Sequence, residues 1–128
     1  MSIESIRGQI LAVETECGAM SSLLQATFTN EMDRSFCVDL HNRIGDASID
    51  VASLIDSAES MADVTPGAHT YDRLQEVLGC LESAGDVLDS AHDLTKQAVD
   101  KGMRQAVVDG LISMLDSVCN ELTEAANA

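Results

Sequence analysis

The stretch that decides the fold is residues 3–24, IESIRGQILAVETECGAMSSLL, in which aliphatic side chains recur at alternating steps of three and four. The recurring positions are Ile3, Ile6, Ile10, Val13, Cys17, Met20 and Leu24. A repeat near 3.5 residues puts such side chains on one stripe of an α-helix, as in helical bundles. The pattern predicts a helix over residues 3–28, capped by Ser2 and carrying its stripe on to Phe28. The polar cluster Thr29-Asn30-Glu31 ends it.

Three further segments repeat the pattern. Residues 34–62 follow Asp33, a good N-cap, and carry Cys37, Leu40, Ile44, Ala47, Val51, Leu54, Ala58 and Met61, a stripe that Phe36 and Ile55 widen. Residues 71–99 carry Leu74, Leu78, Leu81, Ala84, Leu88, Ala91 and Thr95. Residues 102–125 carry Met103, Val107, Gly110 or Leu111, Met114, Val118, Leu122 and Ala125.

Glycine and proline mark the breaks between these segments. Pro66-Gly67 favours a turn, after which Thr70 or a residue beside it caps the third helix. Asp100-Lys101-Gly102 ends that helix. Gly79 and Gly85 lie inside it, where each costs about 1 kcal/mol relative to alanine. Such glycines either admit a close neighbouring helix or are simply tolerated.

These observations predict an all-α fold in which residues 1–128 form one domain. Short links between long helices force antiparallel neighbours, so we expect an up-down-up-down four-helix bundle. Residues 3–62 and 71–125 also each form a helical hairpin, which leaves two tandem hairpins as a variant of this architecture. The composition agrees, because aromatic residues make up only 2% and there is one proline.

The charge of the chain limits its partners. It has 22 acidic and 7 basic residues, a formal net charge of −15, which disfavours direct binding to nucleic acids and anionic membranes. The N-terminal residues lack the positive start of a signal peptide, and no apolar run is long enough to span a bilayer. We therefore expect a cytoplasmic protein whose surface either keeps it dissolved or attracts a basic partner.

The spacing of the histidines, carboxylates and cysteines gives little support for a metal site or a disulfide. The di-iron bundles use Glu-x-x-His motifs, whereas this chain has a single Asp-x-x-His, Asp89 to His92. At 1.5 Å per residue the four cysteines fall at different heights of the bundle; Cys80 and Cys119 come closest, about 14 and 9 Å from its base. We expect buried free thiols, no metal and no cofactor.

Catalysis lacks a recognisable nucleophile and base, and His41, His69 and His92 are isolated in the sequence. Residues 91–96, AHDLTK, are similar in part to the His-x-Leu-Lys-Gly context of histidine phosphotransfer domains, which are four-helix bundles of about this size. The leucine is at the matching offset, the lysine is one place late and the glycine is missing. This resemblance implies His92 as a phosphoacceptor and Lys96 as its charge partner.

A binding role remains once catalysis lacks support. We expect a non-enzymatic protein-interaction or regulatory bundle with a protein partner, with an acidic inhibitor that mimics DNA as the alternative and the His92 phosphotransfer module as a further one. Apolar residues outside the strict stripes also allow a homodimer. If Val108, Ile112 and Leu115 face outward on the fourth helix, they form its contact.

Overall fold

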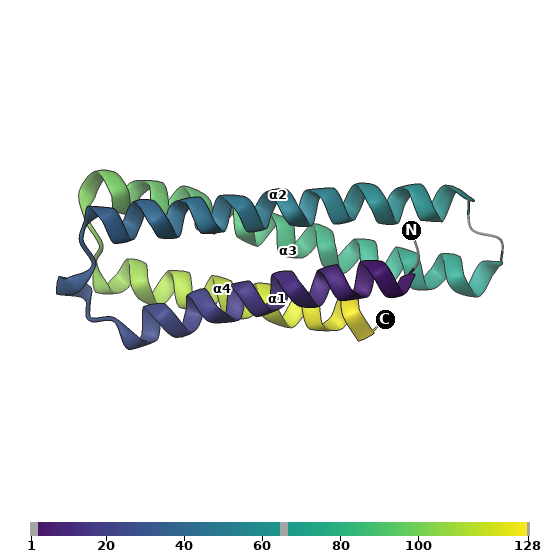
Figure 1. The fold of residues 1–128 in the computed structure, drawn as a ribbon, viewed down its shortest axis with the longest axis horizontal. Helices are drawn as coiled ribbons and strands as arrows, with labels where there is room; N and C mark the ends of the chain where they lie inside the picture. Colours follow the sequence, from purple (N-terminus) through teal and green to yellow (C-terminus); the bar gives the residue numbers. More distant parts are fainter. Residues whose placement is uncertain (1–2, 65–66, 128) are drawn as a thin grey trace.

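The computed structural model describes residues 3–64 and 67–127 and consists of four long helices and one short one (Figure 1). These are α1 (Ile3–Ala26), the 3-10 helix η1 (Thr29–Glu31), α2 (Arg34–Val64), α3 (Ala68–Lys101) and α4 (Gln105–Asn127). No strand occurs in these two ranges. The predicted all-α four-helix bundle is confirmed. Ser2 and Pro66 lie outside the described residues.

The helices close into a ring of antiparallel neighbours (Figure 1). Among the four interfaces between neighbouring helices, that of α2 with α3 is the most extensive and that of α1 with α2 is the smallest. α4 packs on both α3 and α1. The contacts of α1 with α4, and of α2 with α3, therefore join the two halves of the chain more tightly than α1 is joined to α2. Two tandem hairpins that fold separately do not describe this arrangement.

One core draws on all four long helices. The predicted stripe of α1 is buried from Ile6 to Leu24, that of α2 from Cys37 to Ala58, and that of α3 from Leu74 to Thr95. Met61 of α2 and the flanking residues Phe36 and Ile55 pack partly buried against this core. The heptad spacing thus predicts the buried face of three of the four helices correctly, because a regular period places the apolar side chains on one face of the helix.

The extension of the first stripe to Phe28 is wrong. α1 ends at Ala26, and Phe28 lies beyond it in extended backbone with 72% of its surface exposed. Met32, which is 6% exposed, closes the core at this end instead. The short helix η1 reverses the chain here, so the position that continues the period in sequence no longer continues it in space.

The helix ends follow side-chain and backbone chemistry. Asp33 caps α2 as predicted, because its Oδ1 accepts a hydrogen bond from the Phe36 amide at 2.9 Å. Gly102 ends α3 as predicted, with a positive φ of 89° and its amide donating to Ala98 O at 2.8 Å. At the other end α3 begins at Ala68 after Gly67, whose φ is 102°, so Thr70 does not cap it.

The predicted stripe of α4 is displaced by one residue in its first half. Val108 and Leu115 are 3% and 0% exposed, whereas Val107 and Met114 are only half-buried. Adjacent apolar residues made both registers compatible with the period. This burial contradicts the expected dimer contact, since Val108 and Leu115 fill the core of one chain and Ile112 packs partly buried against it.

Three glycines inside helices differ in their surroundings. A Cβ on Gly79 would meet nothing within 4 Å, and one on Gly85 would lie 3.5 Å from Val51 Cγ1. A Cβ on Gly45 would lie 3.3 Å from both Cδ2 and Nε2 of His92, which is tighter than ordinary contact. Gly79 is therefore tolerated, whereas Gly45 makes room for a side chain of α3.

Alanine substitutions test this difference. Gly79→Ala should raise the free energy of unfolding by about 1 kcal/mol through helix propensity. Gly45→Ala should lower it, because the new methyl group displaces the His92 ring. Urea denaturation measures both, with Gly85→Ala as a control that stabilises. Equal stabilisation by Gly45→Ala and Gly79→Ala would show that the ring moves away at no cost.

Candidate functional site

The described histidine side chains meet at the interface of α2 and α3. The imidazole rings of His41 and His92 are stacked, with centroids 3.9 Å apart and planes inclined by 23°. His41 Nδ1 lies 3.1 Å from the carbonyl oxygen of His92 and 2.9 Å from Thr95 Oγ1. Because a carbonyl oxygen only accepts, Nδ1 carries the proton and donates to this pair of acceptors.

Thr95 completes the cluster from within the core stripe. Its side chain is fully buried, and its hydroxyl also lies 3.1 Å from Ala91 O. A hydroxyl that donates to a carbonyl of its own helix and accepts from His41 satisfies its hydrogen-bonding capacity without water. This polar contact explains how a threonine occupies a stripe position that is otherwise aliphatic.

Burial and neighbouring charge act on His41 together. Desolvation lowers the pKa of His41 most, and the charges of His92 and Lys96 lower it further. The hydrogen bond to the His92 carbonyl and the charge of Asp93 act in the opposite direction. The net effect lowers the pKa, so the neutral ring is the form that suits the interface.

His92 is half-buried at this interface. Its ring stacks on His41, and a Cβ on Gly45 of α2 would lie 3.3 Å from its Nε2. The phosphoacceptor role of His92 stays a prediction. Lys96 is exposed one turn further along α3, and its charge acts on His41. Sequence reasoning did not pair His41 with His92, because the two residues are 51 positions apart. The side chain of His69 is not described.

All four cysteines are free; Cys17 and Cys37 are buried as expected, whereas Cys80 and Cys119 are only half-buried. Burial, then the charges of Cys119 and Glu16, raise the pKa of the Cys17 thiol to about 12. Cys119 Sγ contacts Glu14 O of α1 at 3.7 Å, and Cys80 Sγ contacts Glu124 Oε2 at 3.9 Å. The Cys119 thiol thus lies near the backbone of α1, and the Cys80 thiol lies near a carboxylate of α4.

Cys80, Glu121 and Glu124 bring three potential metal ligands within 4.8 Å of one another at the α3–α4 interface. Sequence reasoning missed this group, although the i, i+3 spacing of the two glutamates places both on one face of α4. Burial first, and then nearby carboxylates, raise the pKa of the Cys80 thiol. Proximity alone does not distinguish a cation site from an ordinary acidic surface on a chain of net charge −15.

A pocket lies at the end of the bundle where α4 stops. Apolar side chains of α1, α3 and α4 line it together with polar and charged ones. The lining residues are Glu4, Ile6, Arg7, Ile10, Arg73, Leu74, Val77, Ala125, Ala126 and Asn127. Cysteine, serine and histidine do not contribute to it, so the pocket offers neither a nucleophile nor an imidazole base.

The outer face of α3 carries the clearest charge pattern. Glu82, Asp86, Asp89 and Asp93 are all exposed, and no lysine or arginine lies between the first and the last. Steps of four, three and four residues align their side chains on one face over about 16 Å of helix axis. Asp89 Oδ1 accepts a hydrogen bond from Ser48 Oγ of α2 at 2.6 Å. We call these four residues the α3 acidic row.

The lowered pKa of His41 predicts a pH dependence of stability. As the pH falls below the ordinary value of 6.5, the unfolded chain takes up a proton more readily than the folded one. The free energy of unfolding should therefore be fully retained above that pH and decrease as the pH falls through the folded-state pKa. Urea denaturation of the wild type and of His41→Asn, which retains a side-chain N–H donor, measures the effect. An identical pH dependence in both proteins would contradict it.

Comparisons with protein-family models, characterised proteins and solved structures find no match to this chain. None of the helices in the described ranges is long and apolar enough to cross a membrane. Function is therefore argued from the contacts and charges of the bundle itself.

Proposed function

We propose that this chain is a non-enzymatic protein-interaction bundle that binds a basic protein through the α3 acidic row. The observation that carries the proposal is the alignment of four exposed carboxylates on one face with no lysine or arginine among them. Aligned like charges on a rigid helix raise the local potential and steer an oppositely charged partner. We place the protein in the cytoplasm, where four free cysteines suit a reducing environment.

The geometry supports binding better than catalysis. The stacked histidines hold each other at a helix interface, the thiols have raised pKa values, and the end pocket lacks a nucleophile. These groups support the packing of the bundle rather than the turnover of a substrate. Binding through a fixed surface needs only the rigidity that this packing provides.

Inhibition of a nucleic-acid-binding protein by mimicry is the second candidate. The regular spacing of the α3 acidic row favours it, because mimicry requires evenly placed negative charges. Along the helix axis the row places one carboxylate about every 5.5 Å, compared with one phosphate per 3.4 Å on a DNA strand. The row is thus less dense than a DNA strand, which is why a basic protein of any kind is the first proposal.

Charge-neutral variants test the proposed surface. Glu82→Gln, Asp86→Asn, Asp89→Asn and Asp93→Asn together should weaken binding to the natural partner by about tenfold or more, because four exposed ion pairs contribute roughly 1–4 kcal/mol in sum. The partner is first identified by affinity purification from the native host with mass spectrometry, and its Kd is then measured at several salt concentrations.

The matched control neutralises four exposed carboxylates of α2, Asp39, Asp46, Asp50 and Asp56, and changes the net charge equally. It should retain the partner. Equal loss of binding in both variants would show that net charge alone is responsible and would contradict the role of the α3 acidic row. Displacement of the partner by duplex DNA would favour the second candidate.

A further inference from the structure

The exposed face of α1 is uncharged along most of its length. Between Gly8 and Ala26 every exposed residue of this helix is neutral: Gly8, Gln9, Leu11, Ala12, Thr15, Ala19, Ser22, Leu23, Gln25 and Ala26. The exposed residues of α2, α3 and α4 include carboxylates along each helix. On a chain of net charge −15, one neutral helix face of this length is a distinct surface.

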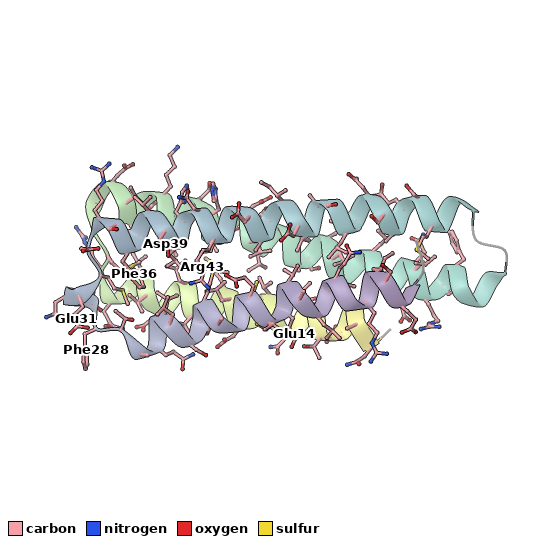
Figure 2. All side chains as sticks on the ribbon, in the orientation of Figure 1. Glu14, Phe28, Glu31, Phe36, Asp39 and Arg43 are labelled. Carbon is pink, nitrogen blue, oxygen red and sulfur yellow. The ribbon has the colours of Figure 1, made fainter. Side chains whose placement is uncertain are left out.

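The two acidic residues within this part of α1 point to its neighbours. Glu14 Oε1 accepts a hydrogen bond from Thr123 Oγ1 of α4 at 3.0 Å. Glu16 Oε1 lies 2.7 Å from Arg43 Nη2 of α2. Figure 2 shows Glu14 and Arg43 on opposite sides of α1. The carboxylates therefore flank the neutral face rather than occupy it.

Small residues form the centre of this face. Gly8, Ala12, Thr15, Ala19, Ser22 and Ala26 follow one another at steps of four and three, the spacing of a second bundle seam. Leu11 and Leu23, which are 40% and 37% exposed, lie beside this seam. Small side chains let a second helix axis approach closely, and the leucines then pack against it.

Two details suit burial of this face. The Thr15 hydroxyl already donates to Leu11 O at 2.9 Å, so removing it from water leaves no unsatisfied donor. A Cβ on Gly8 would meet nothing within 4 Å, so the packing of the chain does not require a glycine there. That glycine costs about 1 kcal/mol of helix stability relative to alanine. Contact with a further helix gives a reason for it.

The face is also self-complementary about position 17. Each of its ten exposed residues has a counterpart at the same distance on the other side: Gly8 with Ala26, Gln9 with Gln25, Leu11 with Leu23, Ala12 with Ser22, and Thr15 with Ala19. The regular seam accounts for the matching heights, but not for the pairing of leucine with leucine and glutamine with glutamine. Such correspondence is what a two-fold interface needs, since residue i contacts j and j contacts i.

We propose that the exposed face of α1 binds a second copy of the chain, with the two α1 helices antiparallel about a two-fold axis beside position 17. Two copies of an acidic chain repel each other wherever carboxylates meet, and this face brings none together at its centre. A symmetric contact between two copies of α3 would instead oppose the α3 acidic row to itself. The second copy is therefore the occupant that both the charge and the symmetry fit.

Sedimentation of the full chain tests the proposal. The wild type should sediment as a dimer of the 13.6 kDa chain, and the association should tighten with added salt, which screens the acidic flanks. Binding of a basic protein to the α3 acidic row should weaken with salt, so the two surfaces are distinguished in one titration. A wild type that remains monomeric at every salt concentration overturns the dimer and leaves the α3 proposal standing.

Paired substitutions test the antiparallel register. Residues 12 and 22 are ten positions apart within one chain but face each other across the proposed axis. Ala12→Glu with Ser22→Glu should give a monomer, whereas Ala12→Lys with Ser22→Glu should restore the dimer through two intermolecular ion pairs. A parallel pair of helices would oppose like charges in the second variant, so a monomer there overturns the register.

A matched control carries glutamate at two exposed alanines outside α1, Ala52→Glu with Ala106→Glu, and should remain dimeric. Circular dichroism establishes that each variant keeps its helices. Dimerisation of the Ala12→Glu, Ser22→Glu variant would overturn the proposed face. The proposal would also be overturned if the wild type were monomeric and bound an unrelated protein that the Ala12→Glu, Ser22→Glu variant no longer binds. The face would then belong to that protein.

Discussion

The bundle depends on removing four aliphatic stripes from water together. A single helix cannot keep its own apolar stripe away from water, so each stripe needs neighbouring helices. The stripe of α1 is covered mainly by α4, the helix most distant from it in the chain. Burial of apolar surface supplies the driving force, and the heptad period determines which side chains contribute. The packing of α1 on α4 therefore closes the bundle and gives the two hairpins one shared core. Which side chains remain on the surface follows from this closure.

Closure also sorts the charges. Glu14 and Glu16 are drawn to hydrogen-bond and ion-pair partners on α4 and α2, which leaves the outer face of α1 neutral. The carboxylates of the α3 acidic row point outward, because the inner face of α3 packs on α2 and α4. The same acidic chain thus has a neutral outer face on α1 and a row of aligned carboxylates on α3.

The polar cluster between α2 and α3 shows how a bundle accommodates histidine. Stacked rings, a buried threonine hydroxyl and the backbone of Gly45 together replace the aliphatic contacts of the neighbouring layers. Residues 91–96 resemble a phosphotransfer context, but that local motif gives no sign that the ring of His92 stacks on His41. A short sequence motif does not predict the tertiary contacts of its residues.

The sequence alone determined the helices, the buried faces of α1, α2 and α3, the Asp33 cap and the Gly102 terminus, because each follows from local periodicity or local backbone chemistry. Only the tertiary structure decided the register of α4, where adjacent apolar residues fit the period equally well. It also decided the pairing of His41 with His92, the exposure of Phe28 and the neutrality of the α1 face. These depend on which helix lies beside which, and spacing along one chain carries no record of that.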